Sequence, residues 1–558
     1  AKLGQKLCSK KAGGQVPEYP RQELPDATKW DHTKWSPNYR NDNRIETHES
    51  GTAPCKTACP AHVAVQGYLK LAAQGRYDEA LALIKRENPL PAICGRVCNR
   101  RCEDACTRGR VDAAVAIDEV KKFIAQRDLD AATRYVPPVV TPTRAGGFDQ
   151  KIAIIGAGPA GLSCAFYLAE KGYKPVVFEK NERPGGMLTY GIPSFKLEKD
   201  VIEAEVEVIR LMGAEFRYGV EVGRDVTLDE LRAQGFKAFY VAIGCQGGRL
   251  AGIPGEGAED VTVAVDFLRE VNSGKIDSLS GRTIVVGGGN VAIDVARNAC
   301  RLGSEHVEMF CLESDAQMPA SEEERREAIE DGAHISCGWG PKEIHLDEAG
   351  RVCGITFKRC TRVFDDEGRF APEYDENDLR RVDADRVVMS IGQSIVWGDL
   401  LAGSKVELGR GQGALADPQT YQTAEPDIFV GGDVYTGPSF AIDAIAAGHE
   451  AAVSIHRFVQ PGSTLTIGRN QRRYTALDRD DVVIESYDNA SREVAHVDRE
   501  REKAAPFSEY VETFTEEQVR AETARCLGCG ASIVDPNKCI GCGLCTTKCA
   551  FDAIHLHR

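Results

Sequence analysis

The sequence has no long apolar segment and no excess of basic residues. None of its apolar runs approaches the roughly 18 residues of a membrane-spanning helix, and no N-terminal signal segment is visible. The net charge is −15, whereas a nucleic-acid-binding surface needs basic residues for the phosphates. We therefore expect a cytoplasmic protein with neither a membrane nor a nucleic-acid partner.

Hydrolytic motifs are missing as well. The sequence contains no Ser–His–Asp set, no His-x-x-x-His pair and no nucleophilic cysteine motif. Its 558 residues are enough for several globular domains with proper cores. Any catalytic chemistry would then come from bound cofactors, which the protein positions.

Cysteine, by contrast, is abundant, and 12 of the 20 cysteines form two groups. A disulfide framework suits a short secreted chain rather than this one, so we predict metal or cluster ligation. The spacing at the N-terminal end is C-x3-C-P followed by C-x3-C-x3-C-x3-C. Structural zinc, the alternative, prefers C-x2-C pairs, whereas soft thiolates suit iron–sulfur clusters. The predicted ligands are Cys55, Cys59, Cys94, Cys98, Cys102, Cys106, Cys526, Cys529, Cys539, Cys542, Cys545 and Cys549.

A strand, a glycine-rich turn and a helix follow one another in "KIAIIGAGPAGLSCAFYLAEKGYKPVVFEK". Gly156, Gly158 and Gly161 give G-x-G-x-x-G, in which the glycines allow a tight turn, a close pyrophosphate and close helix packing. Glu179 ends the next strand, where a carboxylate can accept hydrogen bonds from ribose hydroxyls. The alternative is a tight turn with no ligand.

The segment "TIVVGGGNVAIDVARNACRLG" repeats this pattern. Gly287, Gly289 and Ala292 occupy the three positions, with Asn290 beside them. Two such units predict an α/β fold with two Rossmann-like dinucleotide-binding domains. An α-helical iron–sulfur domain would precede them, and a ferredoxin-like segment would follow.

Three segments, "RPGGMLTYGIPSFKLEK", "YVAIGCQG" and "IFVGGDVYTGPSFAIDAIAAGHEAA", resemble the flavin half of the glutamate synthase small-subunit family. The resemblance implies FAD at the first site and a nicotinamide dinucleotide at the second. It places Lys196 near the flavin ring as the catalytic residue, although a surface lysine is the alternative. The further cofactor-binding residues that it implies are Gly185, Gly186, Met187, Gly244, Gly392, Gly432 and Asp433.

The strand after the second glycine loop distinguishes NADH from NADPH. NADPH-dependent members of the family resemble "YRR" before "MP", and their arginines hold the 2′-phosphate. This chain has "FCLESDAQMP", with Leu312 and Glu313 at those positions. A carboxylate accepts hydrogen bonds from the free 2′-hydroxyl and repels a phosphate, so we predict NADH. In the alternative, Glu313 is a solvated turn residue and Arg325 or Arg326 binds the phosphate.

The N-terminal cysteines resemble the two-cluster domain of the same family and of dihydropyrimidine dehydrogenases. Those relatives have a further C-x2-C pair before the position of Cys55, where this chain has Thr47 and Ser50. A Gln or Glu that often completes the other cluster aligns with Lys121, a poor ligand. The resemblance therefore implies Cys94 beside Cys59, Cys98 and Cys102.

The segment "ARCLGCGASIVDPNKCIGCGLCTTKCAFDAIHLHR" contains a ferredoxin half-motif, so Cys539, Cys542 and Cys545 should share one cluster. Its "AETARCLGCG" resembles the segment that supplies the missing pair in relatives. We predict that the tail folds back, within the chain or across a dimer, and that Cys526 and Cys529 join Cys55 and Cys106. The alternative keeps the pair local, with Cys549.

The combined prediction is an NADH-dependent oxidoreductase with FAD and two to four [4Fe–4S] clusters. Its electrons would pass to a redox protein, either a ferredoxin or the dissimilatory sulfite reductase of sulfur oxidation. Alternatives are a subunit of a glutamate synthase or of a bifurcating transhydrogenase, and a non-catalytic relay subunit. The expected domains are 1–145 (arm and helical cluster domain), 146–265 with 395–460 (FAD), 266–394 (NAD), 461–520 (extended linker) and 521–558 (ferredoxin-like segment).

Overall fold

The computed structural model describes residues 51–139, 148–480, 482, 484, 487–530 and 540–543. One compact unit spans Thr52–Cys529, and a second combines Ala1–Gly51 with Gly530–Arg558. Residues 1–50 and 140–147 lie outside the described residues, as do Cys539, Cys545 and Cys549. The predicted domain boundaries stay predictions.

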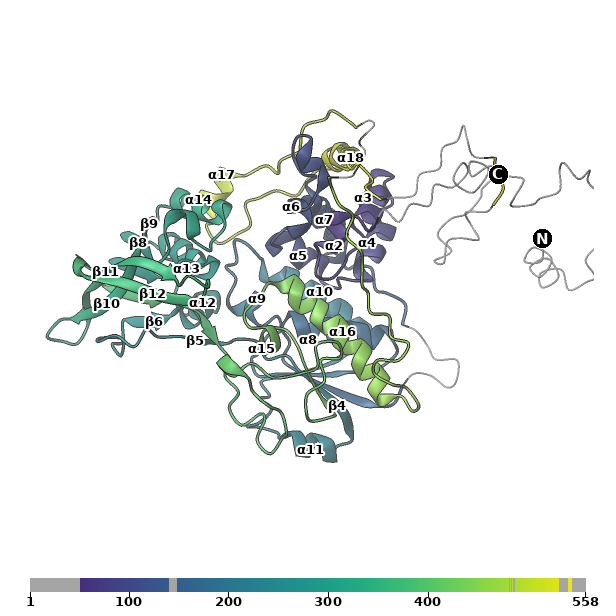
Figure 1. Cartoon of the computed structure of the whole chain (residues 1–558), viewed down its shortest axis with the longest axis horizontal. Helices are drawn as coiled ribbons and strands as arrows, with labels where there is room; N and C mark the ends of the chain where they lie inside the picture. Colours follow the sequence, from purple (N-terminus) through teal and green to yellow (C-terminus); the bar gives the residue numbers. More distant parts are fainter. Residues whose placement is uncertain are drawn as a thin grey trace, which may run out of the picture. The chain divides into compact units, whose positions relative to one another are not determined.

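Short helices form the N-terminal part of the larger unit. They are α2 (Pro54–Thr57), α3 (Val65–Ala73), α4 (Tyr77–Lys85), α5 (Pro91–Val97), α6 (Arg101–Asp104) and α7 (Ile117–Ala125), with 3-10 turns at Thr107–Arg110 and Gln126–Asp128. Apolar residues three to four apart, such as Leu81 and Ile84 of α4, lie on one buried face. Helix α18 (Glu516–Ala524), from the far end of the chain, packs against α3 and α7 (Figure 1).

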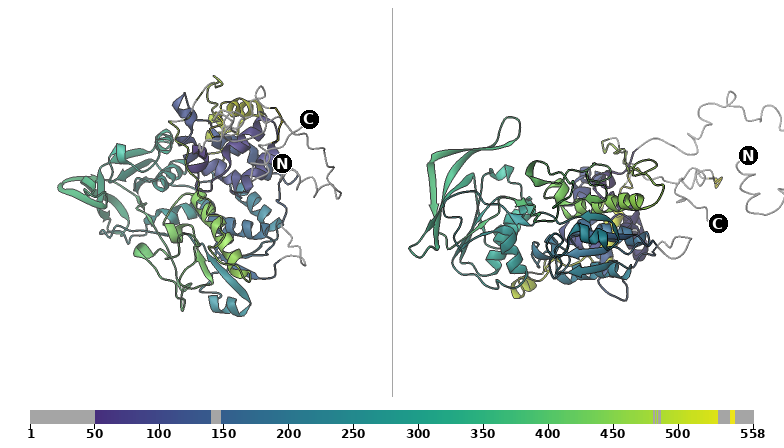
Figure 2. Two further views of the ribbon diagram at one scale, coloured as in Figure 1. Left: turned by 45° about the vertical axis from the view of Figure 1, so that its right-hand side comes forward. Right: turned by 90° about the horizontal axis from the view of Figure 1, so that it is seen from below.

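The first sheet is parallel, with strand order β15-β4-β1-β2-β3. Its strands are β1 (Lys151–Ile155), β2 (Val176–Glu179), β3 (Glu215–Tyr218), β4 (Phe236–Val241) and β15 (Ile428–Val430). The accompanying helices are α8 (Pro159–Glu170), α9 (Met187–Tyr190), α10 (Lys199–Leu211), α11 (Leu228–Ala233), α15 (Asp433–Thr436) and α16 (Ala441–Val459). Helices α8 and α16 lie side by side (Figure 1; Figure 2).

The second sheet is also parallel, with strand order β6-β13-β7-β8-β9. It consists of β6 (Val261–Val263), β7 (Arg282–Val286), β8 (His306–Cys311), β9 (His334–Cys337) and β13 (Arg386–Met389), with helices α12 (Ala264–Asn272), α13 (Asn290–Arg301) and α14 (Glu322–Glu330) and the 3-10 turn Asp315–Gln317. An antiparallel sheet follows β9, formed by β10 (Trp339–Leu346), β11 (Val352–Phe364) and β12 (Phe370–Val382). The short strands β5 (Gly247–Gly248) and β14 (Gln393–Ser394) pair where the chain passes between the two parallel sheets.

These two five-stranded parallel sheets, each followed by helices, confirm the predicted α/β class with two Rossmann-like units. Between α16 and α18 the described chain has one helix, α17 (Arg499–Ala504), together with isolated bridges such as Val497 to Val511. This route returns the chain to the N-terminal helices. Every helix in the described residues is too short or too polar to cross a membrane.

Candidate functional site

The loop after β1 has the geometry that a dinucleotide needs. Gly156 has φ +105°, and a Cβ there would lie 2.5 Å from the Ala242 carbonyl oxygen. A Cβ on Gly161 would lie 2.0 Å from the Gly156 oxygen, so α8 packs too closely for a side chain. A Cβ on Gly158, in contrast, would meet nothing within 4 Å. The backbone is therefore open for a ligand at Gly158, as the sequence predicts.

A cavity of about 290 Å³ opens from this loop. The predicted cofactor residues that line it are Gly156, Gly158, Glu179, Gly186, Met187, Gly244, Gly432 and Asp433. Glu179 accepts hydrogen bonds from the Ala157 and Asn181 amides at 2.8 and 2.9 Å, which fixes its carboxylate at the end of β2. The first turn of α16 forms part of the wall, where helix amides favour a negative charge. The amides at the first turn of α16 and the open loop at Gly158 fit an elongated, anionic dinucleotide.

Asp433 has an unusual electrostatic environment at this wall. Burial raises its pKa to about 6, although the Ser439 amide donates a hydrogen bond to its carboxylate at 3.2 Å. Gly432, directly before it, has φ +67° and lies against Ala160. The tight backbone therefore holds the carboxyl group of Asp433 in the cavity wall.

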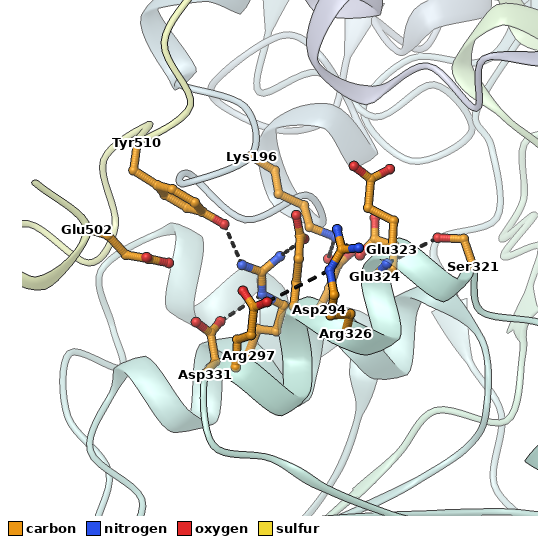
Figure 3. A network of polar contacts seen from close by, with 12 residues as sticks. Lys196, Asp294, Arg297, Ser321, Glu323, Glu324, Arg326, Asp331, Glu502 and Tyr510 are labelled. Atoms are coloured by element: carbon orange, nitrogen blue, oxygen red, sulfur yellow. Dashed lines mark hydrogen bonds and ion pairs between the residues drawn. The ribbon is translucent and has the colours of Figure 1, made fainter. Parts of the chain in front are cut away.

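Apart from Gly161, which packs α8 against the loop, three of the residues predicted at the first site do not line this cavity. Gly185 has φ +107° and packs against Thr189, and Gly392 has φ +114° and faces Arg249. The third is Lys196, whose Nζ lies 2.6 Å from Asp294 Oδ1 and also contacts Glu324 (Figure 3).

Lys196 therefore connects the first parallel sheet's unit to helices α13 and α14 of the second. Burial opposes its charge, but Asp294 and Glu324 outweigh this effect and raise its pKa. Asp294 itself lines the cavity, and burial raises its pKa to about 6. Sequence reasoning missed Asp294, because nothing in the sequence of α13 shows which residue faces another domain.

Other parts of the cavity wall were also missed. Lys180, which contacts the Gln246 side chain, directly follows Glu179, and its position at a strand end was a usable signal. Trp397 and Leu400 lie in an irregular segment, and no sequence pattern indicated that they would reach the site.

The second glycine loop repeats the first. Gly287 has φ +144°, and its Cβ would lie 2.2 Å from the Ser390 oxygen, whereas a Cβ on Gly289 would be in open space. Ala292 is fully buried at the third position. Asn290 begins α13, and its Oδ1 accepts a hydrogen bond from the Ser321 amide at 3.2 Å.

Glu313 follows β8 and lies against this loop, because a Cβ on Gly288 would be 2.9 Å from Glu313 Oε2. Leu312, in contrast, packs toward Gly340 of β10. Of the two arginines in the NADPH alternative, Arg325 forms an ion pair with Asp315, and Arg326 lies 3.8 Å from Glu330. Glu313 is thus the predicted residue that the structure places beside the loop.

Cys55, Cys106, Cys526 and Cys529 line one small cavity, although the last two are more than 400 residues from the first two. Apolar side chains, among them Leu69 and Ile117, form other parts of its wall. Burial raises the pKa of the Cys55 thiol, and the neighbouring thiols of Cys526, Cys106 and Cys529 raise it further. Thiolates gathered in apolar surroundings need a compensating cation, so these residues fit an iron–sulfur cluster.

Arg525 fixes the tail beside this cavity. Its side chain is fully buried and donates to Asp112 at 3.0 Å, Glu522 at 2.6 Å and the Ala113 carbonyl at 2.6 Å. Glu522 in turn accepts from the Ala116 amide at 2.7 Å. These hydrogen bonds hold the tail against the N-terminal helices independently of the cysteines.

A second group of thiols surrounds Lys121. Cys94 and Cys98 interact with each other and with Lys121, Cys98 also with Cys59, and Cys102 with Cys98 and Lys121. Burial opposes the charge of Lys121, but Asp118 and the thiols outweigh it and raise its pKa. Lys121 thus contributes a positive charge to this group of thiols. The resemblance implied that relatives often have a Gln or Glu ligand at this position.

No cluster of His, Cys, Asp or Glu within the described ranges is arranged around a single metal ion. An iron–sulfur core is several atoms wide, and its thiolates stand further apart than the ligands of one ion. Cys542 is exposed, and its neighbours in the ferredoxin half-motif are outside the described part of the chain.

Comparisons with known proteins agree with this geometry. Residues 150–448 match the pyridine nucleotide-disulphide oxidoreductase family. Residues 46–133 match dihydropyrimidine dehydrogenase domain II with its 4Fe-4S cluster, and residues 532–555 match a 4Fe-4S binding domain.

Relatives with known names cover most of the chain. The NADP(+)-dependent formate dehydrogenase subunit beta of Moorella thermoacetica is 35% identical over 86% of this chain and 70% of its own length. The glutamate synthase [NADPH] small chain of Escherichia coli K12 is 35% identical over 74% and 89%. The NAD-dependent dihydropyrimidine dehydrogenase subunit PreT of Escherichia coli O157:H7 is 32% identical over 73% and 91%. The predicted oxidoreductase with FAD and iron–sulfur domains is confirmed at this level, whereas the choice of NADH is not tested.

Proposed function

Since this chain belongs to the pyridine nucleotide-disulphide oxidoreductase family, we propose that it is an NADH:acceptor oxidoreductase that passes electrons through FAD and [4Fe–4S] clusters to a protein partner. Electron transfer by an NAD(P)H-dependent flavin and iron–sulfur oxidoreductase is the shared property of its relatives. The preference for NADH, the order of transfer and the partner are the proposed parts.

The preference for NADH rests on Glu313. Its carboxylate lies against the second glycine loop, where it can accept hydrogen bonds from ribose hydroxyls. A phosphate on the 2′-oxygen would meet a like charge there, and the nearby Arg325 is already paired with Asp315. Relatives named for NADPH and for NAD are both known, so the family alone does not decide.

FAD, when bound, would accept a hydride and release electrons singly. Gly158 would leave room for the pyrophosphate, and Glu179 would hold the ribose at the end of β2. Asp433 would position the region between pyrophosphate and flavin ring. Lys196 remains the proposed catalytic residue, now with Asp294 and Glu324 as partners that fix its ammonium group.

The observation that carries the electron route is the contact between Arg101 and α16. Arg101, which directly precedes Cys102, forms a bidentate pair with Asp443 at 2.9 and 3.1 Å. Its guanidinium also lies 5.5 Å from the ring centroid of Phe440, which lines the flavin cavity. The residue before Cys102 thus contacts the cavity wall, so electrons would leave FAD toward Cys102.

We propose two clusters in the helical domain. One would be held by Cys59, Cys94, Cys98 and Cys102, and the other by Cys55, Cys106, Cys526 and Cys529. The support is the grouping of these thiols in the structure. Cys539, Cys542 and Cys545 would hold a further cluster for the exit of electrons, with the role of Cys549 open.

The partner is a redox protein, because relatives are named as subunits or small chains of larger enzymes. A dissimilatory sulfite reductase and a ferredoxin remain the predicted acceptors. Mixing the reduced protein with each purified acceptor would identify it, since only the true partner should reoxidise the flavin at a rate that saturates with acceptor concentration.

Anaerobic mixing with NADH tests the proposed activity. NADH should bleach the flavin absorbance within the turnover time, and an equal concentration of NADPH should do so at least ten times more slowly. A flavin that stays oxidised with both nucleotides would instead favour the relay subunit, which binds FAD and never meets a nicotinamide.

A further inference from the structure

A second cavity lies where the N-terminal helical domain meets α16 and the segment after it. Its volume is about 320 Å³, which is similar to that of the flavin cavity and within the range of metabolite sites. The wall combines His62 from the cluster domain, Gln419 and Tyr421 from the loop before β15, and arginines from residues 469–473. None of the residues assigned to FAD or NADH lines it.

The wall is positively charged in a chain whose net charge is −15. It contains three arginines, Arg469, Arg472 and Arg473, against one glutamate, Glu450. Both carboxylate oxygens of Glu450 are already engaged, one with Arg469 at 2.6 Å and one with Arg472 at 3.2 Å. Glu87, which does not line the cavity, also pairs with Arg472, so Arg473 is the arginine of the wall that has no carboxylate partner in the described chain. This excess cation favours an anionic occupant.

Two of these arginines are held rigidly. The side chain of Arg469 is 1% exposed and donates to Ser454 Oγ at 2.6 Å. Arg472 donates to the Ala61 carbonyl at 2.9 Å and pairs with Glu87. Because these contacts fix their guanidinium groups, this part of the cavity wall is preorganised.

Two hydrogen-bond donors at the cavity wall are available to a ligand. The Nε2 atom of Gln419 is buried and has no hydrogen-bond partner, which is costly unless something accepts from it. Arg473 is exposed and forms no ion pair with any residue that the structure describes. An amide and a free guanidinium together match the oxygens of a carboxylate or a phosphate.

Backbone strain concentrates at the same place. Five non-glycine residues in the described chain have positive φ, and three of them line this cavity: His62 at 54°, Tyr421 at 60° and Arg472 at 49°. They come from three separate segments. Such conformations are unfavourable for residues with a side chain, and they cluster at ligand sites.

We propose that this cavity binds a small organic metabolite through a carboxylate or phosphate group. Gln419 and Arg473 would contact its oxyanion directly, and Arg469 and Arg472, held by their carboxylate partners, would form the rigid wall behind it. The site is separate from the dinucleotide sites, and the proposal does not depend on the choice of NADH or of the electron acceptor.

Titration of the full-length protein, with its cofactors as isolated, tests this site. Citrate binding would be measured by calorimetry and inorganic phosphate binding by ³¹P resonance, at an ionic strength held constant with potassium chloride. We expect saturable binding of at least one of these anions with one site per chain. Saturation by citrate alone would indicate a carboxylate ligand, and saturation by phosphate alone a phosphate ligand.

Two variants locate the binding. Arg473→Gln should weaken it at least tenfold and Gln419→Leu at least threefold, whereas Arg381→Gln, an exposed arginine on β12, should leave it unchanged. Arg473 is exposed, so its replacement should not affect folding, and the flavin absorbance of each variant checks this. The proposal is overturned if neither anion saturates the wild-type protein, or if both cavity variants bind as tightly as Arg381→Gln.

Discussion

Replacement of Glu313 by Gln should move the cofactor preference toward NADPH. Glutamine keeps the shape of the side chain and one oxygen that accepts from a ribose hydroxyl, and removes only the charge. The carboxylate lies against the second glycine loop, so the change acts where the adenosine ribose would lie. Leu312 is a poorer target, because it packs toward Gly340 and an arginine there would disturb β10.

The size of the effect follows from Coulomb's law. Two like charges about 4 Å apart repel by about 4 kcal/mol at an effective dielectric constant of about 20. Glu313 is only half-buried, so water and salt reduce this value. We expect about 1.4–2.8 kcal/mol, which is a tenfold to hundredfold rise in kcat/KM for NADPH.

Flavin reduction under anaerobic stopped flow measures both nucleotides with the same enzyme. Glu313→Gln should change kcat/KM for NADH by less than about threefold, since one charge-assisted hydrogen bond becomes neutral. Glu313→Arg should raise NADPH use further, and Glu348→Gln, in the exposed β10–β11 turn, should change neither. Equal use of both nucleotides by the wild type, or an unchanged ratio in Glu313→Gln, would refute the role of this carboxylate.

Three further changes test the cluster and flavin sites. Cys526→Ser combined with Cys529→Ser should remove about four iron atoms per chain and leave the flavin in place; full iron content in that variant would contradict the fold-back ligation. Truncation after Gly530 should preserve NADH:dye activity and abolish transfer to the natural acceptor, and loss of both activities in one assay would mean that the tail supports the flavin site. Lys196→Met should slow flavin reduction by NADH at least tenfold at unchanged flavin content, and Asp294→Asn should slow it less; an equal loss in both would assign the effect to the ion pair rather than to Lys196 at the flavin.

Local sequence patterns predicted the two glycine loops, because the roles of their residues depend on near neighbours in the chain. Gly156, Gly158 and Gly161 follow a strand and begin a helix, so their separate roles could be derived from steric requirements alone. The same reasoning gave Gly287, Gly289 and the buried Ala292. Fold class follows from these units, because each strand–loop–helix–strand unit supplies two neighbouring strands of a parallel sheet.

Contacts between domains could not be predicted in this way. Lys196 lies in an irregular segment after α9, and its partners Asp294 and Glu324 are about 100 residues or more away. The sequence gives the charge of each residue and nothing about which face of α13 meets the first domain. The arginine-lined cavity could not be predicted for the same reason. In the sequence, Arg469, Arg472 and Gln419 look like ordinary surface residues, and only the fold brings their segments together.

For the fold-back of the tail, the resemblance to relatives predicted more than the cysteine spacing alone. Spacing alone left Cys526 and Cys529 equally suited to a local cluster, and the likeness of their segment to a missing N-terminal pair favoured the distant one. The structure adds the physical reason for the juxtaposition, because buried Arg525 bonds both Glu522 of the tail and Asp112 of the N-terminal domain. A buried guanidinium is stable only with its partners present. The proposed cluster site of Cys55, Cys106, Cys526 and Cys529 would therefore be completed only after residue 529 has been synthesised, and so after both dinucleotide-binding units.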